Sequence, residues 1–152
     1  MQRQADDLEA QRPGSEASTE QPSPWEACAD DTFVARLGSV RQRISDGLIE
    51  ISLQTDETHA NLSGIVHGGV IMTLIDRVIG VNCRRASGGI PMVTASLTVN
   101  FLRPVAVGDR LTASCVLRKR GRTAYFADGL ACVTDTLVAT ATGTWLRAAK
   151  RP

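Results

Sequence analysis

The sequence predicts an α+β fold in which one curved antiparallel sheet wraps around a single long helix. Residues 68–84 carry apolar side chains at helical spacing, which makes one broad apolar face. Residues 93–101 instead alternate between apolar and polar side chains, a period of two that is typical of a strand. Further strand patterns follow without another helix between them, so antiparallel hairpins are the expected connections.

The remaining elements are predicted from turn residues and apolar spacing. The other expected strands are Val40–Ile44, Leu48–Leu53, Leu111–Leu117, Tyr125–Val133 and Val138–Leu146. Asp31-Thr32 can cap a helix in which Phe33, Val34 and Leu37 fall together and which Gly38 ends. Residues 55–65 show no period and are expected to form a loop.

The first residues differ in composition from the rest of the chain. Residues 1–24 are rich in Gln, Glu, Ser and Pro and hold one large aliphatic side chain, Leu8, so a disordered acidic tail is expected. Residues 25–150 are expected to form one domain with one core. Residues 1–31 have a net charge of −6 and the remainder has +7. A basic folded part implies an anionic partner.

Membrane and metal proteins are not expected. The chain has no apolar run long enough to span a membrane and no signal-peptide pattern, so a cytoplasmic protein is predicted. The cysteines, Cys28, Cys83, Cys115 and Cys132, are widely spaced and form no cluster with histidine. We therefore expect no metal site and no cofactor, and we interpret the cysteines as small buried side chains.

One acidic residue lies on an unusual side of the predicted helix. On a helical wheel, Asp76 falls between the apolar face and the polar face. Its stripe also carries Gly69, Met72, Gly80 and Cys83. Such small or apolar neighbours suit close contact with another surface, where a carboxylate must be paired, hydrogen-bonded or functional. A surface ion pair with Arg77 or Arg84 is the alternative interpretation.

His67-Gly68-Gly69 stands where the loop becomes the helix. The first N–H groups of a helix have no partner within it, and glycine lets a ligand approach them closely. This makes a suitable site for a developing oxyanion. A plain turn with a surface histidine is the alternative, and Asn61 taken alone is an ordinary loop residue.

Together these residues resemble the signature of the PaaI-like hotdog-fold acyl-CoA thioesterases. The pattern reads Asn61-x5-His67-Gly68-Gly69-x6-Asp76, with Thr94 eighteen residues after the acid. The segments 100–104, 108–109 and 118–122 also fit, so the resemblance covers about residues 40–147. The pattern indicates the family but not the substrate.

The resemblance implies a role for each matched residue. Asp76 would attack the thioester carbonyl or activate a water to do so, and the Gly68 N–H would hold the oxyanion. Asn61 and His67 would position the thioester or the water, and Thr94 would help to orient the water. In this family the site forms at a dimer interface. A homo-oligomer, a dimer or a tetramer, is therefore expected, with Asp76 and Gly68 from different subunits.

The resemblance also implies which residues bind the acyl-CoA substrate. Gly69, Phe101 and Arg103 are expected to contact it. The basic turn, residues 118–122, is expected to face the CoA phosphates, with Lys119, Arg120, Gly121 and Arg122 as the contact residues. A solvated turn without a ligand is the alternative. No helix-turn-helix, zinc finger or RNA-binding aromatic pair occurs, so no nucleic acid partner is expected.

Two other functions on the same fold stay open. One is a non-catalytic acyl-CoA sensor, although the tail is too short and too polar for a helix-turn-helix. The other is a hydratase or dehydratase, although His67-Gly68-Gly69 matches the thioesterases better. Neither G-x-S-x-G nor a metal motif occurs, so serine and zinc hydrolases have no local support.

Overall fold

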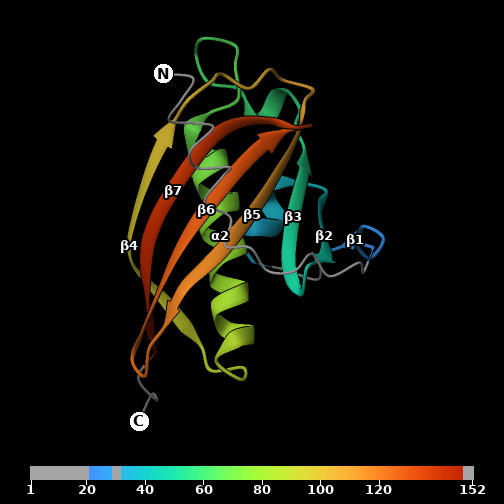
Figure 1. The fold of residues 1–152 in the computed structure, drawn as a ribbon. Coiled ribbons are helices and arrows are strands. Elements are labelled where there is room, and N and C mark those ends of the chain that lie inside the picture. Colours follow the sequence, from blue (N-terminus) through green and yellow to red (C-terminus); the bar gives the residue numbers. More distant parts are fainter. Residues whose placement is uncertain (1–20, 29–31, 149–152) are drawn as a thin grey trace.

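The computed structural model describes residues 21–28 and 32–148, and it has the predicted architecture. A curved antiparallel sheet wraps around one long helix, α2, which spans Gly68–Ala86 (Figure 1). The spatial order of the strands is β1-β2-β3-β5-β6-β7-β4. Residues 1–20 of the expected tail and Asp31 of the expected helix cap lie outside the described residues.

The strands agree with the predicted ones to within a few residues, and a short first strand is added to them. Their bounds are β1 Glu26–Ala27, β2 Val40–Ser45, β3 Leu48–Gln54, β4 Met92–Phe101, β5 Arg110–Arg120, β6 Ala124–Val133 and β7 Thr136–Arg147. Two 3-10 helices precede α2, namely η1 at Val34–Leu37 and η2 at Glu57–His59.

The core lies between α2 and the concave face of the sheet. The helix buries the apolar face that its spacing predicts, Val70, Ile71, Leu74, Ile75, Val78 and Ile79. The helix approaches β6 so closely that a Cβ on Gly129 would lie 2.6 Å from Ile75 Cγ2. A side chain at position 129 would therefore push α2, and the residues it carries, away from the sheet.

A buried asparagine that sequence reasoning did not single out fixes α2 against β3. Asn82 Nδ2 donates to the carbonyl groups of Ile49 and Val78 at 2.9 and 2.8 Å. The Ile49 N–H donates to Asn82 Oδ1 at 2.9 Å. Because each buried polar group left without its partner costs roughly 1–3 kcal/mol, these bonds set the position of the helix along β3.

The edge of the sheet beside β2 begins before residue 25. The Ser23 N–H donates to the Ile44 carbonyl at 2.9 Å, and the Ile44 N–H donates to Ser23 Oγ at 2.8 Å. The Arg43 guanidinium lies 4.6 Å from the centre of the Trp25 ring. The paired part of the chain therefore includes Ser23, within the range expected to be tail.

The helix expected around Phe33 is only a single 3-10 turn. Phe33 takes the cap position without a side-chain cap hydrogen bond, and Gly38 ends the turn at a φ of +90°, as predicted. Val34 is buried, but the Phe33 side chain is 63% exposed. In a 3-10 helix, side chains three residues apart lie on the same side, so Val34 and the partly buried Leu37 both pack against the core, whereas Phe33 does not join the predicted shared face.

The strict alternation predicted for residues 93–101 is interrupted by a β-bulge. Thr94 is opposite Trp145 and Ser96 is opposite Thr144, so Ala95 is an extra residue. Thr94 contacts α2, and beyond the bulge the partly buried Leu97 packs against the core. A regular strand would have placed these two side chains on opposite faces.

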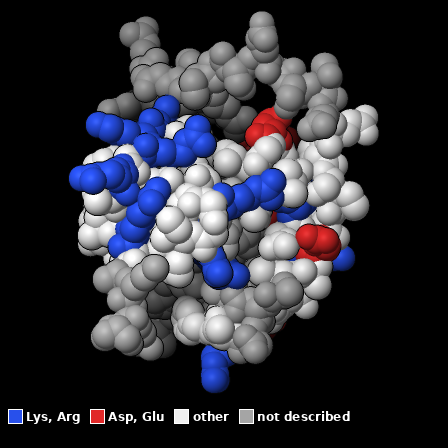
Figure 2. Space-filling model, turned by 90° about the horizontal axis from the view of Figure 1, so that it is seen from below, with Lys and Arg blue, Asp and Glu red and all other residues white. Residues whose placement is uncertain are grey.

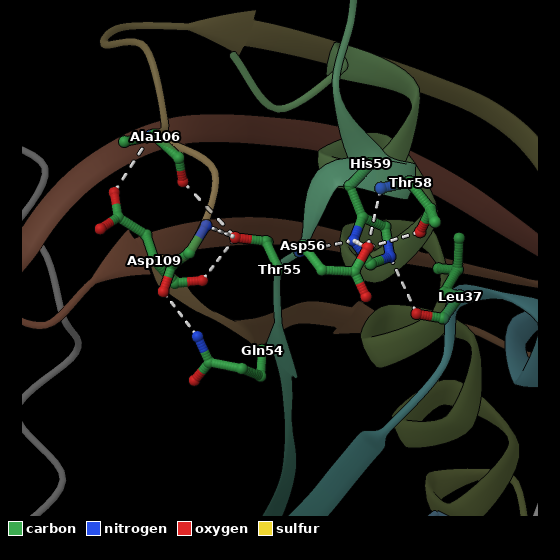
Figure 3. A network of polar contacts seen from close by, with 9 residues as sticks. Leu37, Gln54, Thr55, Asp56, Thr58, His59, Ala106 and Asp109 are labelled. Carbon is green, nitrogen blue, oxygen red and sulfur yellow. Dashed lines mark hydrogen bonds and ion pairs between the residues drawn. The ribbon is translucent and has the colours of Figure 1, made fainter. Parts of the chain in front are cut away.

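One polar network anchors the end of β3 to the turn between β4 and β5 (Figure 3). Thr55 Oγ1 donates to the Asp109 carbonyl at 2.7 Å and accepts the Gly108 N–H at 3.1 Å. Gln54 Nε2 donates to the Gly108 carbonyl at 2.6 Å. Gly108 has a φ of +95°, which favours glycine at this turn.

A buried histidine continues this network toward α2 (Figure 3). His59 Nδ1 accepts the Asp56 N–H at 2.9 Å, and Nε2 lies 2.9 Å from the Leu37 carbonyl oxygen. Nδ1 also lies 3.0 Å from Asp56 Oδ1, so the ring is held by Asp56 on one side and by Leu37 on the other. The His59 carbonyl in turn accepts the His67 N–H at 2.8 Å. His59 thus fixes the backbone of the residue that precedes the helix.

Two of the four cysteines are the buried side chains that the sequence predicts. Burial raises the pKa of Cys83 to about 11 and that of Cys115 to about 12, so both thiols are protonated at neutral pH. Cys28 and Cys132 are partly exposed. Over the described ranges, no helix is long and apolar enough to cross a membrane. The cytoplasmic location stays a prediction.

Candidate active site

Asp76 and Thr94 form a hydrogen-bonded pair between α2 and β4. Thr94 Oγ1 donates to Asp76 Oδ1 at 2.6 Å. The Asp76 side chain is half-buried, and Met72 one turn earlier is 39% exposed. The stripe predicted to receive another surface is therefore open at Met72, whereas its far end at Cys83 is buried in the core.

The start of α2 presents one backbone donor. His67 is the N-cap, and its Nδ1 accepts the Gly69 N–H at 2.8 Å. The Gly69 donor is therefore occupied. For the Gly68 N–H, the described part of the chain offers no acceptor. This is the donor that the sequence analysis assigns to the oxyanion.

Both glycines at the helix start have close side-chain neighbours. A Cβ on Gly68 would lie 3.0 Å from Phe101 Cζ, and a Cβ on Gly69 would lie 3.0 Å from His67 Nδ1. The Phe101 ring therefore covers the Gly68 end of the helix, although the side chain is itself 50% exposed. This contact joins the end of β4 to the start of α2.

Asn61 shapes the loop in front of the helix. Its Oδ1 accepts the N–H groups of Ser63 and Ile65 at 2.8 and 3.3 Å. It also lines a cleft of about 390 Å³ together with Gly68, Phe101 and Arg103. Asn61 is thus a loop-closing residue that stands in the same cleft as the Gly68 donor.

Within one chain these residues form two separate groups. The first is the Asp76–Thr94 pair, and the second gathers Asn61, Gly68, Phe101 and Arg103 around one cleft. Asp76 follows Gly68 by eight helical residues, which is about 12 Å along the axis. A base and an oxyanion donor must both lie about 3 Å from the reacting group, so one chain alone does not hold both.

The predicted cations are also divided between two ends of the molecule. Arg103 follows β4, and its Nη1 donates to the Leu137 carbonyl at 2.6 Å. The basic turn lies at the opposite end of the sheet (Figure 1), beyond the eleven residues of β5, which span about 36 Å. Arg103 and the basic turn of one chain therefore cannot contact the same small ligand.

The basic turn belongs to a larger basic end of the molecule. Figure 2 shows this end from below, with Lys and Arg atoms over much of it and acidic residues over small areas. Lys119, Arg120 and Arg122 are exposed, whereas Arg118 is paired with Asp128 at 2.6 Å. In Gly121, a Cβ would lie 2.7 Å from the Ala124 carbonyl oxygen, so this residue shapes the turn.

Two arginines that sequence reasoning did not connect with the substrate extend the basic end. Arg84 and Arg85 are exposed in the last turn of α2 and line a cleft of about 560 Å³ that reaches Asp76. Tyr125 Oη donates to the Ala86 carbonyl at 3.4 Å, which links the helix end to the strand after the basic turn. The sequence signal that could have found them is their position directly after the apolar residues of the helix.

Comparisons with known proteins agree with this architecture. A family model described as the thioesterase superfamily matches residues 63–140. Acyl-coenzyme A thioesterase 13 of Mus musculus is 27% identical over 75 residues, which are 49% of this chain and 54% of that protein. The structure of the Escherichia coli PaaI protein has a TM-score of 0.70 and 25% identity, covering 78% of this chain and 86% of that one. The Bacillus halodurans protein BH2602, solved with CoA, has a TM-score of 0.73 and 25% identity, covering 82% and 83%.

The chain belongs to the thioesterase superfamily, because the family model matches half of its length. It has the hotdog fold of the PaaI-like thioesterases, and the resemblance inferred from the sequence is confirmed. The alignment with the mouse relative spans about half the length of that protein.

Proposed function

We propose that this chain hydrolyses acyl-CoA thioesters to the free acid and CoA, at a site that two copies build together. The observation that carries the proposal is the separation of the Asp76–Thr94 pair from the unoccupied Gly68 donor within one chain. Family membership supports the reaction, as does the name of the mouse relative, an acyl-coenzyme A thioesterase. The CoA in the Bacillus halodurans structure supports the substrate class.

The free edge of β4 offers a way to bring the two groups together. In the described sheet β4 is an edge strand, and its residues Val93 and Phe101 are half-exposed. Antiparallel pairing of two β4 strands about a two-fold axis between Leu97 and Thr98 would place Phe101 of the partner subunit opposite Thr94. Because Phe101 packs on Gly68 and Thr94 binds Asp76, the donor of one copy would then meet the acid of the other.

The chemistry of this composite site is hydrolysis of a good leaving group. Asp76 would take a proton from a water molecule while the oxygen of that water adds to the thioester carbonyl carbon. The Gly68 N–H of the partner subunit would donate to the oxygen that becomes negative. The C–S bond would then break, and the proton on Asp76 would pass to the departing CoA sulfur. Direct attack by Asp76, followed by hydrolysis of the anhydride, uses the same two groups.

The other matched residues would support this reaction. Thr94 would hold the Asp76 carboxylate in place through its 2.6 Å hydrogen bond. Asn61 and His67 of the partner subunit would flank the carbonyl oxygen or the water. Lys119, Arg120 and Arg122, with Arg84 and Arg85, would attract the CoA phosphates toward the basic end.

Subunit mixing tests both the reaction and the composite site. Asp76→Asn should lower hydrolysis of a medium-chain acyl-CoA by about two to four orders of magnitude, the range for a positioned base. Gly68→Pro should also be nearly inactive. After the two variants exchange subunits in equal amounts, about half of the dimers are mixed, and each holds one intact site of two. About one quarter of wild-type activity should return, whereas a site within one chain would regain none.

A further inference from the structure

Two clefts meet at Asp76, and their linings differ. The arginine cleft, of about 560 Å³, runs along the end of α2 and includes Asp76, Arg84, Arg85, Met92, Thr94 and Trp145 in its lining. The η1 cleft, of about 390 Å³, lies between η1, α2 and β4 and includes Phe33, Val34, Met72, Thr73, Asp76 and Leu97. Arg77 lines both clefts where they join.

This difference matches the two parts of a thioester whose carbonyl carbon stands at Asp76. One part is CoA, which is polar and carries phosphates, and the other is the acyl group, which is apolar. The arginine cleft leads to the exposed guanidinium groups of Arg84 and Arg85 at the basic end. The η1 cleft is lined mainly by apolar side chains. Among the lining residues of the η1 cleft only Arg77 is a cation, and it lines the arginine cleft as well. Exchanging the two parts would therefore take the phosphates away from Arg84 and Arg85 and place them mainly among apolar groups.

We infer, on the basis of the proposed function, that the acyl group lies in the η1 cleft and that Met72 sets its accepted size. Met72 precedes Asp76 by four residues, so both lie on one helix face, and its side chain is 39% exposed. Because the η1 cleft is mainly apolar and measures about 390 Å³, the expected substrates carry apolar acyl groups longer than acetyl. Each further methylene removed from water should raise kcat/KM about fourfold, until the cleft is filled.

The walls around Met72 come from two other elements. Leu97 lies on β4 beyond the Ala95 bulge, which turns its side chain to the same face as Thr94. Val34 of η1 is buried, and Phe33 beside it is largely exposed. Phe33 thus stands at the rim, where the acyl group leaves the surface of a single chain.

The test compares two methionines, one in each cleft. Initial rates are measured with a series of straight-chain thioesters from acetyl-CoA to dodecanoyl-CoA, and with phenylacetyl-CoA as an aromatic member. Met72→Trp fills the η1 cleft, so kcat/KM for acyl groups of eight carbons or more should fall at least about tenfold while acetyl-CoA changes less than about twofold. Met72→Ala should move the optimum to longer chains.

Met92→Trp is the matched variant, because Met92 lines the arginine cleft and not the η1 cleft. It should change KM for every acyl length by the same factor and leave the shape of the length profile unchanged. Thermal melting and sedimentation of each variant show whether it folds and assembles as the wild type does. A length profile that shifts with Met92→Trp, or that does not shift with either Met72 variant, would overturn the inference.

A wild-type chain that hydrolyses none of these thioesters would refute the proposed function but would still allow the acyl position to be tested. The probes are then free CoA and the non-hydrolysable thioether decyl-CoA, with binding measured by calorimetry. Decyl-CoA should bind more tightly than CoA to the wild type, and Met72→Trp should remove that difference. Equal binding of both probes by the wild type would refute the acyl position as well.

Discussion

The Thr94 hydroxyl reaches the Asp76 carboxylate because β4 is bulged directly after Thr94. The bond from Thr94 Oγ1 to Asp76 Oδ1 is 2.6 Å long, and Ala95 is the residue without a partner on β7. The bulge allows a polar side chain and the apolar Leu97 to face the helix from the same strand. An acid half-buried at the helix face is thereby given a fixed hydrogen-bond partner, as a carboxylate in such a position requires.

Replacing Thr94 separates this positioning role from packing. Thr94→Val keeps the shape and removes the hydroxyl, whereas Thr94→Ser keeps the hydroxyl and removes the methyl group. A hydrogen bond to a charged group is worth about 1.5–3 kcal/mol, so Thr94→Val should lower kcat at least about tenfold with little change in KM. Thr94→Ser should retain most of the activity. Equal losses in both variants would mean that Thr94 acts through packing alone.

Gly68 offers a direct test of the oxyanion donor. Gly68 is the first residue of α2, a position that tolerates proline, and His67 has the extended backbone that a residue before proline requires. Gly68→Pro therefore removes the N–H and keeps the helix. It should lower kcat by about two to three orders of magnitude, as loss of an oxyanion donor does.

Gly68→Ala is the control for this change. It adds a Cβ at the same place, 3.0 Å from Phe101 Cζ, but keeps the N–H. The half-exposed Phe101 ring can move aside, so the alanine variant should be much more active than the proline variant. Similar rates for the two variants, measured under saturating acyl-CoA, would show that the added side chain and not the lost donor is responsible.

His67 combines a structural role with a proposed catalytic one, and two variants distinguish them. Its Nδ1 caps α2 through the Gly69 N–H, which leaves Nε2 to carry the proton of the neutral ring. His67→Ala should lower the free energy of unfolding by about 1 kcal/mol, the usual cost of a lost cap. His67→Asn restores a capping side chain and should recover most of that stability.

The activities of the two His67 variants should behave differently from their stabilities. Both lack the imidazole that would contact the thioester or the water, so kcat should fall about tenfold in each, the effect of one hydrogen bond. Urea unfolding and steady-state rates measured on the same preparations provide the comparison. An asparagine variant with full activity would leave His67 with the capping role only.

The sequence predicts the periodic parts of this molecule well, because helix and strand periods follow from burial of one face. The helix from Gly68 and the strands after it are confirmed to within a few residues. The bulge at Ala95 escapes prediction, since a small side chain there is compatible with either face of a strand. The buried polar residues Asn82 and His59 escape as well, because their partners are backbone groups distant in sequence.

The candidate site, too, can be predicted from the sequence only in part. The residues Asn61, His67, Gly68 and Asp76 are found through a family pattern, and their loop and helix are where the pattern places them. These residues form two separate groups in the folded chain, and their spacing along the sequence does not show this. Likewise, Arg84 and Arg85 are ordinary residues of a helix end until the turn at 118–122 is brought beside them.

The exposed arginines of the basic end are predicted to bind the CoA phosphates. Arg120 and Arg122 are exposed beside Gly121, at the end of the molecule toward which the arginine cleft runs. Phosphate contacts far from the scissile bond stabilise the ground state and the transition state equally, so their loss raises KM more than it lowers kcat. Each exposed contact is worth roughly 0.2–1 kcal/mol, which makes a single change worth only a few-fold.

The double variant Arg120→Ala, Arg122→Ala should therefore raise KM for acyl-CoA while sparing an acyl thioester of N-acetylcysteamine, which lacks the nucleotide. Arg110→Ala is the matched control, because Arg110 is also exposed but begins β5 at the end away from the basic turn. It should leave KM for both substrates unchanged. The increase caused by the double variant should shrink as salt is added, since salt screens exposed charges. A double variant that loses activity equally on both substrates would show that the basic turn supports the fold and does not hold CoA.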